Sequence, residues 1–321
     1  MNLRDLAKAA NVSVSTASKA LNGSKELNDE TIAHVLKVAK ECEYFVEKKK
    51  QRKSVTKKLG QVIIVIPEII SVYYSTIATE LTHRIRSVGF DARVYLYNFV
   101  AEYRSAIFHE SLYDDAVVGI ISVDCNFDSF EIGDFPIIKL GARYSDDSND
   151  FDMIVKVFEH LVSLGHKKIY YFGEKLTLSR EKFFLQAAKK LELDLNLCKT
   201  FVSNYRFEKA GYKLAEEIIK TDDIPTAIVA AYDEIAFGAI SALTANGCKV
   251  PEDVSVVGIN NVPAAEFFTV PLTTFGASSN DFIEEAARTL ENLLLGKNAN
   301  EIIPVERKLF VRKSTAKAKE I

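Results

Sequence analysis

The first 45 residues contain three short stretches in which apolar residues recur every three or four positions. Leu3–Ala10, Val14–Ala20 and a third stretch from about Asn28 to Ala39 each place their apolar residues on one side of a helix. Ser13 can cap the second helix through its hydroxyl group. The pattern predicts a small bundle of three short helices.

From residue 59 onward, short runs rich in β-branched residues alternate with amphipathic stretches of helical period. This alternation predicts parallel sheets that are covered by helices on both faces. Two units of about 120–130 residues fit the length, and a small ligand would bind in the cleft that they share. The predicted strands are Val62–Ile66, Val94–Tyr97, Val117–Val123, Ile137–Leu140, Lys168–Phe172, Ala227–Ala231 and Val254–Ile259. The predicted helices are Tyr74–Val88, Phe151–Leu164, Ser179–Leu191, Phe207–Lys220, Glu234–Asn246 and Asp281–Leu295.

Charge is distributed unevenly along the chain. The 41 Lys or Arg and 44 Asp or Glu give a net charge of −3. Residues 1–58 hold 13 of the basic residues against 7 acidic ones, which leaves 28 against 37 for residues 59–321. Residues 1–43 are neutral, so the positive surplus lies in residues 44–58, where seven basic residues face Glu47 alone. We interpret this segment as a basic linker or arm.

The composition argues against several classes of protein. At 48% hydrophobic and 26% charged residues, the chain has the proportions of a globular protein. No apolar run approaches the roughly 18 residues that a membrane-spanning helix needs, and residues 1–6 show no apolar signal core. We therefore expect a cytoplasmic protein without membrane contact. The four cysteines lie far apart and indicate neither a disulfide framework nor a zinc site.

The sequence also lacks the motifs of common enzyme classes. It contains no G-x-G-x-x-G, no P-loop and no G-x-S-x-G, and its five histidines are scattered. We expect a protein that is not an enzyme and that has no catalytic residues, no cofactor and no bound metal.

The segment from Leu6 to Gly23 has the pattern of a helix-turn-helix. Small Ala7 lets two helices approach closely, Asn11 suits the turn, and Ala17 packs inward. A recognition helix needs short polar groups at its start, which meet phosphates, and one or two side chains that reach base edges. A solvated serine-rich helix would show the same pattern, but the adjoining basic arm favours DNA binding. The side chains left outside are Val14, Ser15, Ser18, Lys19 and Asn22.

These residues, with several segments of the body, closely resemble the LacI/GalR family of bacterial repressors. The resemblance covers about residues 2–312 and is strongest over Val250–Asn261 and the following Pro271–Thr274. The other matching segments are Leu3–Lys8, Val12–Ser18, Leu21–Gly23, Ser163–Ile169, Pro225–Ile228 and Asp233–Ala239.

The resemblance implies an α/β protein in three parts. Residues 1–45 would form a three-helix helix-turn-helix head, residues 46–59 a basic hinge or linker, and residues 60–321 an effector-binding and dimerisation domain. The body would resemble periplasmic binding proteins, with two doubly wound parallel-sheet subdomains. The N-subdomain would take about residues 60–144 and 276–301, and the C-subdomain about 145–274 and 302–313.

The resemblance also assigns DNA contacts to the head. The two residues that open the recognition helix, Val14 and Ser15, would read bases, and both are small, so direct readout would be less sharp than with a long amide side chain. Lys19 stands where the family usually has Arg and lacks the planar fork that suits guanine. The phosphate contacts would fall to Ser13, Thr16 and Asn22, with Ser18 on the same outer face.

The linker departs from the family pattern. The family has a Tyr-x-Pro-Asn start and a hinge helix whose leucine wedges into the minor groove. Here Tyr44 is present, Val46 and Glu47 replace the Pro and Asn, and Lys53 stands at the leucine position. An ammonium group cannot replace an apolar wedge, so we expect binding through phosphate charge and a steep dependence on salt. The basic residues assigned to this contact are Lys48, Lys49, Lys50, Arg52 and Lys53.

In the body, the family places a small effector between the two subdomains. Aromatic faces suit sugar C–H surfaces or flat bases, and Arg180 aligns with an arginine that grips effector hydroxyl groups or carboxylates. Phe207 or Tyr205 would supply a further ring, although a one-to-one count puts Arg206 there. For these side chains, core packing or a surface position is the alternative. The residues assigned to the effector are Tyr73, Tyr74, Arg180, Phe207, Tyr232 and Asn260.

Taken together, the sequence predicts a DNA-binding transcriptional regulator, a repressor of sugar uptake or catabolism genes. A homodimer would bind a pseudopalindromic operator in double-stranded DNA, on the nucleoid, under the control of a sugar effector. Two alternatives stay open within this architecture, namely a body that binds a nucleobase and one that binds a partner protein. A periplasmic sugar-binding protein is excluded because it would need an export signal and no helix-turn-helix.

Overall fold

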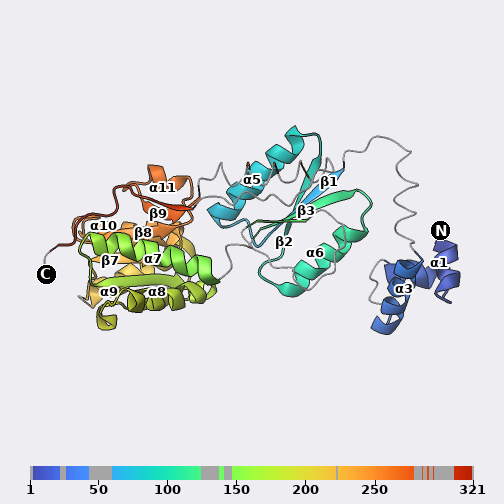
Figure 1. The fold of residues 1–321 in the computed structure, drawn as a ribbon, viewed down its shortest axis with the longest axis horizontal. Coiled ribbons are helices and arrows are strands. Elements are labelled where there is room, and N and C mark those ends of the chain that lie inside the picture. The colour runs from blue at the N-terminus through green and yellow to red at the C-terminus, as the bar shows by residue number, and fades with distance from the viewer. Residues whose placement is uncertain are drawn as a thin grey trace.

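The computed structural model describes residues 3–21, 27–42, 60–123, 137–140, 147–221, 223–277 and 307–319, together with residues 284, 288 and 292. Three short helices come first, and two sheets with their covering helices follow (Figure 1). Most of the predicted helix Asp281–Leu295 lies outside the described residues, as do Cys125 and the whole linker. Among the residues described, no helix is long and apolar enough to cross a membrane.

The three predicted head helices are present. They are α1 Leu3–Ala9, α2 Val14–Leu21 and α3 Asp29–Glu41. Their core is small because it is built mostly from alanines, which allow the helices to pack closely. Its buried residues are Leu6, Ala7, Ala10, Ala17, Ala20, Val35 and Ala39.

The first lobe of the body is a parallel sheet of order β2-β1-β3-β4 with α5 and α6. The bounds are β1 Gln61–Ile66, α5 Val72–Ser87, β2 Asp91–Leu96, α6 Ala101–Tyr113, β3 Val117–Val123 and β4 Ile137–Leu140. Successive residues of β1 point to opposite faces: Ile64 packs with Leu81 of α5, and Ile63 packs with Phe108 of α6. Because both faces are covered, β1 is apolar from Val62 to Ile66.

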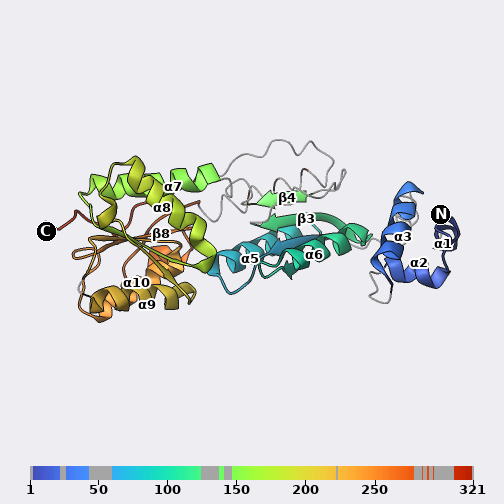
Figure 2. The ribbon, with the colours of Figure 1, turned by 90° about the horizontal axis from the view of Figure 1, so that it is seen from below.

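The second lobe lies at the opposite end of the molecule from the three head helices (Figure 2). Its six-stranded sheet has the order β10-β9-β8-β7-β5-β6. All neighbours are parallel except β10, which pairs antiparallel with β9 at the edge. The strands are β5 Ile169–Glu174, β6 Thr200–Ser203, β7 Ala227–Ala230, β8 Ser255–Ile259, β9 Thr273–Gly276 and β10 Lys308–Phe310. The helices are α7 Asp147–Ser163, α8 Leu178–Lys190, α9 Phe207–Lys220, α10 Asp233–Ala245 and the short α11 Ala264–Phe267, with 3₁₀ turns at Lys175–Thr177 and Leu195–Leu197.

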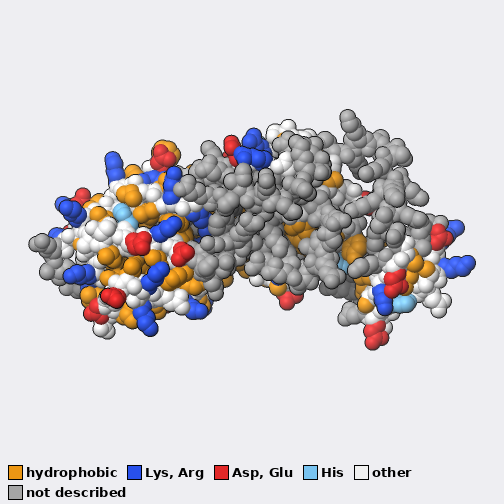
Figure 3. Space-filling view, in the orientation of Figure 1, with side chains coloured by type: hydrophobic (Ala, Val, Ile, Leu, Met, Phe, Trp, Pro, Cys, Tyr) orange, Lys and Arg blue, Asp and Glu red, His pale blue; other side chains and the backbone are white. Residues whose placement is uncertain are grey.

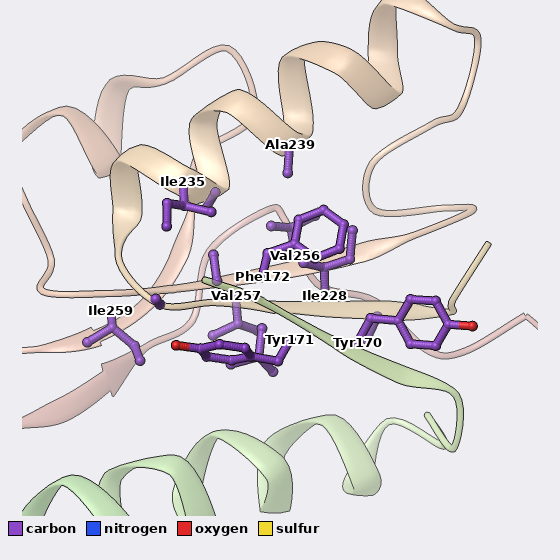
Figure 4. Packing of buried hydrophobic residues seen from close by; sticks show 14 of the residues in the cluster. Tyr170, Tyr171, Phe172, Ile228, Ile235, Ala239, Val256, Val257 and Ile259 are labelled. Atoms are coloured by element: carbon purple, nitrogen blue, oxygen red, sulfur yellow. The ribbon is translucent and has the colours of Figure 1, made fainter. Parts of the chain in front are cut away.

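The core of this lobe lies on both faces of the sheet (Figure 4). Ile235 and Ala239 of α10 lie over one face, and neighbouring strand residues alternate between the faces, with Phe172 turned toward α10 and Tyr171 away from it. On the far side, the ring centroids of Tyr171 and Phe184 of α8 are 5.5 Å apart. Because helices cover both faces of the sheet, all residues of β5 are buried, and Ile169–Phe172 form a continuous apolar run.

The sequence pattern missed α6 and the strands β6, β9 and β10. In α6, few of the apolar residues face the core: Ile107 and Phe108 are buried, while Tyr103 and Tyr113 are exposed. The helix therefore shows no apolar stripe of helical period. The missed strands are only three or four residues long, which is too short for a pattern to stand out.

The exposed surface of the second lobe mixes both signs of charge. In the view of Figure 3, Lys and Arg side chains lie among Asp and Glu, and they gather in no single basic patch on the part of this face that is described. Nothing on this face therefore concentrates the attraction of a polyanion such as DNA.

Candidate functional site

The start of the predicted recognition helix is fixed by Ser13. Its hydroxyl accepts a hydrogen bond from the backbone N–H of Thr16 at 3.0 Å and lies 2.8 Å from the hydroxyl of that residue. This is the N-cap geometry that the sequence predicted. Before it, Asn11 adopts a left-handed conformation with φ 52°, which Asn tolerates better than most residues. The turn between α1 and α2 is therefore stabilised by Asn11, which adopts the left-handed conformation, and by Ser13, which caps α2.

The outer face of α2 carries most of the residues that were assigned to DNA. Ser13, Val14, Ser15 and Lys19 are exposed, and Val14 is 43% exposed despite its apolar side chain. Thr16 and Ser18 are half-buried at the edge of this face. An exposed apolar residue at a helix start suits contact with a thymine methyl group. The remaining assigned residues lie outside the described residues: Asn22, Lys48, Lys49, Lys50, Arg52 and Lys53.

A second site is an open cavity of about 920 Å³ between the two lobes. Several of its lining residues lie at the carboxyl end of a parallel strand or within three residues after it. Glu68 follows β1, Arg206 follows β6, Tyr232 follows β7 and Asn260 follows β8, while Glu174 ends β5. This edge of an open parallel sheet is where ligands of α/β proteins bind, so the topology places the site.

All six residues that were assigned to the effector line this cavity, and Arg206 and Asp150 line it with them. Tyr73 and Tyr74 come from the first turn of α5, and their rings meet edge to face with centroids 5.2 Å apart. Arg180 comes from α8 and Asn260 from the turn after β8. Side chains that are far apart in the sequence and come from both lobes thus line one cavity.

Arg180 is held in place by the lobe that carries it. Its Nη1 donates a hydrogen bond to the carbonyl oxygen of Ala231 at 2.6 Å, and its Nε lies 3.4 Å from Oδ2 of Asp150. The guanidinium group therefore has a fixed orientation at the end of β7. A guanidinium group whose orientation is already fixed loses little further side-chain entropy when a ligand binds beside it.

The chain between β6 and α9 resolves the ambiguity over the third ring. Both Arg206 and Phe207 line the cavity. Tyr205 is 46% exposed, and its ring lies 4.1 Å from Nζ of Lys209. Phe207 has φ 55°, a strained conformation for a residue with a large side chain. Tyr205 is not among the residues that line the cavity.

Three charged residues of the cavity, Arg206, Glu68 and Glu174, form a cluster that the sequence pattern did not predict. Arg206 donates from Nη1 and Nη2 to the two carboxylate oxygens of Glu68 at 2.6 and 2.7 Å, and from Nε to Glu174 at 3.2 Å. Hydrogen bonding to Glu68 is the main cause that raises the pKa of Arg206. Since the three residues are 138 and 32 positions apart, only the fold could bring them together.

Tyr232 links this cluster to the backbone of α9. Its hydroxyl group accepts a hydrogen bond from the N–H of Phe207 at 3.1 Å and donates to Oε1 of Glu174 at 3.3 Å. Burial raises the pKa of this phenol, so Tyr232 stays a neutral donor. Tyr232 thus connects Glu174 with the backbone of Phe207.

Asp233 holds the turn after β8, which contributes Asn260 to the cavity. It is fully buried, and its two carboxylate oxygens accept hydrogen bonds from Thr274 Oγ1 at 2.5 Å and from the N–H of Val262 at 2.8 Å. Burial raises its pKa to about 8. Val262 follows Asn260 and Asn261, which both have positive φ. Asp233 therefore fixes the turn that carries Asn260 into the cavity.

The histidines and cysteines near the second lobe and the head have structural roles or remain free thiols. Nε2 of His160 lies 3.1 Å from Thr315 Oγ1, and Nε2 of His166 lies 3.0 Å from the carbonyl oxygen of Ala316. Both histidines hold the segment after β10 against the second lobe. Cys42, Cys198 and Cys248 are free thiols. Among the described residues, no group of three or more His, Cys, Asp or Glu could hold a metal ion.

Two family descriptions match the chain. Residues 2–46 match "Bacterial regulatory proteins, lacI family", and residues 158–315 match "Periplasmic binding protein-like domain". The chain belongs to the LacI family. It is a DNA-binding transcriptional regulator with a helix-turn-helix head and a periplasmic-binding-protein-like body, and it is not an enzyme.

Full-length relatives support this assignment. The repressor PurR of Mannheimia succiniciproducens is 29% identical over an alignment of 335 positions that covers 98% of each chain. The crystal structure of the lac repressor dimer bound to operator and the anti-inducer ONPF has a TM-score of 0.65 at 20% identity and covers 98% of this chain and 99% of that one. The complex of the regulator CelR with cellobiose has a TM-score of 0.62 at 20% identity, with the same coverage.

Proposed function

We propose that this LacI-family regulator represses genes for the uptake or breakdown of a sugar, and that the sugar is its effector and binds in the cavity between the lobes. The observation that carries the proposal is the chemistry of the cavity wall. It combines aromatic rings with carboxylates and guanidinium groups at the carboxyl ends of parallel strands.

Sugar-binding sites combine aromatic rings with charged hydrogen-bonding groups. The C–H face of a sugar ring packs on aromatic side chains, and Tyr73, Tyr74 and Phe207 supply such faces. Pairs of sugar hydroxyl groups donate to carboxylates and accept from guanidinium groups, and Asp150, Glu174 and Arg180 supply these. The structurally similar CelR is known in complex with cellobiose, which supports a sugar in this fold.

The alternative small ligand is a nucleobase. The ring of Phe207 and the edge-to-face pair of tyrosines would also accept a flat base, and the carboxylates and the amide of Asn260 could bind its polar edge. A body that binds a partner protein is the third possibility, and it predicts that no small ligand binds.

We also propose how the chain meets DNA. Val14 and Ser15 face base edges, Lys19 reaches farther into the major groove, and Ser13, Thr16, Ser18 and Asn22 contact phosphates. The basic linker residues add sequence-independent attraction. A two-fold dimer presents two heads to a pseudopalindromic operator. The regulator acts in the cytoplasm, on the nucleoid when it is bound to its operator.

The test starts with ligand identity. Isothermal titration of the full chain with a panel of sugars and a panel of nucleobases separates the three possibilities. We expect one sugar to bind and Tyr73→Ala to weaken it at least tenfold. A nucleobase that binds while all sugars fail would replace the sugar proposal, and no binding from either panel would favour a protein partner.

The second step measures DNA binding. An operator is selected from a random-sequence pool, and fluorescence anisotropy gives its affinity with and without the ligand. Lys19→Ala is expected to weaken operator binding while ligand binding stays intact. An unchanged operator affinity would remove Lys19 from the interface. A ligand that binds but leaves operator affinity unchanged would overturn its role as effector.

A further inference from the structure

One ion pair crosses the cavity and joins the two lobes directly. Glu68 follows β1 in the first lobe, and Arg206 precedes α9 in the second. Both oxygens of the Glu68 carboxylate accept hydrogen bonds from the guanidinium group, at 2.6 and 2.7 Å. A two-point contact of this kind fixes the distance and the relative orientation of its two partners.

The guanidinium group is also enclosed by its surroundings. From its own lobe, Glu174 accepts from Nε at 3.2 Å, and the ring of Phe207 lies 4.5 Å from the guanidinium carbon. From the first lobe, the ring of Phe99 lies at 5.7 Å. Glu68 and Glu174 are both buried. The Arg206 side chain keeps 31% exposure, but because both carboxylates are buried, the attraction exceeds that of a fully exposed surface pair.

We propose that the Glu68–Arg206 ion pair is a latch by which the chain itself holds its lobes together across the effector cavity. The inference rests on the proposed function only in assigning the effector to this cavity. Arg206 then determines specificity as well as closure, because a ligand that reaches this end must bind around the pair or separate it. The closure of the lobes is thus set partly by the chain before any ligand adds to it.

The latch can be broken without unfolding either lobe. Each lobe has its own buried core, and Glu68 and Arg206 belong to neither. A second contact between the lobes, from Glu234 to the N–H of Val72, does not involve the ion pair. Loss of the latch therefore shifts the balance between closed and open lobes.

The experiment measures lobe closure in the full chain without ligand or DNA. Dyes are attached at the exposed positions Glu80 in α5 and Glu217 in α9 through an introduced azide side chain, and single-molecule energy transfer gives the ratio of closed to open molecules. Glu68→Gln, Arg206→Gln and the double variant are compared with the unmodified chain. Circular dichroism and thermal unfolding confirm that each variant folds.

We expect Glu68→Gln to lower the ratio of closed to open molecules at least tenfold, the change that about 1.4 kcal/mol produces. The double variant should lower it no further, since either substitution alone breaks the pair. In the unmodified chain, salt between 50 mM and 1 M should lower the same ratio, and Glu68→Gln should remove much of this salt dependence. If Arg206→Gln does not fold, Glu68→Gln and the salt series carry the test.

Lys213→Gln is the matched control. It breaks an ion pair of 2.7 Å between Lys213 and Glu216 that lies within α9 and joins no lobes. Its closure should equal that of the unmodified chain. Equal closure in Glu68→Gln, or effects of the two single substitutions that add in the double variant, would overturn the latch. Because no ligand is present, a failure of the sugar proposal leaves these results unchanged.

Discussion

The side chain of Glu234 accepts a hydrogen bond from the backbone N–H of Val72, with 3.2 Å between Oε1 and N. Glu234 lies in α10 of the second lobe, and Val72 is the first residue of α5 in the first lobe. Ser71 donates its hydroxyl proton to the same oxygen at 3.4 Å. A carboxylate from one lobe thus caps a helix of the other, and this helix carries Tyr73 and Tyr74 into the cavity.

Removal of this carboxylate should loosen the start of α5. A lost helix cap costs about 0.5–2 kcal/mol, so we expect the backbone amides of residues 72–75 to exchange several-fold to tenfold faster in Glu234→Ala. Hydrogen exchange followed by mass spectrometry measures this. Glu217→Ala, at an exposed position on α9, is the control. Unchanged protection of the first turn of α5 in Glu234→Ala would show that the cap contributes nothing to its stability.

Asp233 should make the stability of the protein depend on pH. Its pKa in the folded protein is raised by burial to about 8, above the 3.8 of the free side chain. The stabilisation associated with its protonated form is therefore complete below about pH 4 and is lost as the pH rises to about 8, by up to about 1.4 kcal/mol per pH unit.

Asp233→Asn removes the titrating group and should remove this part of the pH dependence. We expect the stability of the unmodified chain to fall relative to that of the variant between pH 5 and pH 8.5. Urea unfolding at several pH values gives the difference. If the difference between the two proteins is the same at every pH, Asp233 does not titrate in this range.

Two glycines allow α9 and α10 to pack closely. A Cβ atom at Gly211 would lie 1.8 Å from the carbonyl oxygen of Ile235, and one at Gly238 would lie 1.9 Å from that of Glu208. Backbone atoms cannot give way as a flexible side chain can, so Gly211→Ala should destabilise the second lobe by at least about 3 kcal/mol.

Gly89→Ala is the comparison for this substitution. Gly89 has φ +90° and nothing within 4 Å of an added Cβ, so its cost is limited to backbone strain of about 1–2 kcal/mol. Urea unfolding of both variants tests the ranking. A larger loss for Gly89→Ala than for Gly211→Ala would contradict the explanation by close helix contact.

The N-cap of α2 should support the DNA-binding face. Ser13→Ala removes the hydroxyl that accepts from the N–H of Thr16, which should cost about 1 kcal/mol of helix stability. We expect faster amide exchange at the start of α2 and weaker operator binding. Ser15→Ala, at an exposed residue of the same helix, should weaken operator binding without faster exchange. Equal exchange in the two variants would leave Ser13 without a capping role.

Much of the fold could be predicted from local patterns. The bounds of β3, β4 and α9 match the predicted ranges, because each is a self-contained stretch with one period of apolar residues. The helices of the head and the cap by Ser13 follow from short-range interactions in the same way. The pattern did not predict α6, because few of its apolar residues are buried and Tyr103 and Tyr113 are exposed.

The cavity could be predicted only through resemblance to a family. Tyr73, Tyr74, Arg180, Phe207, Tyr232 and Asn260 were assigned from that resemblance, and all six line one cavity. Glu68, Glu174 and Asp150 gave no signal, because a single acidic residue after a strand or in a helix looks like any solvated charge. Their meaning comes from partners far away in the sequence.

The sequence by itself determined the three head helices, the alternation of strands and helices in the body, and the basic segment 44–58, since each depends on neighbouring residues. Only the tertiary structure decided that Arg206 meets Glu68 and Glu174, and that Glu234 caps a helix of the other lobe. These contacts join residues between 32 and 162 positions apart. Their formation depends on how the strand ends of two separate sheets face one another, which no local pattern encodes.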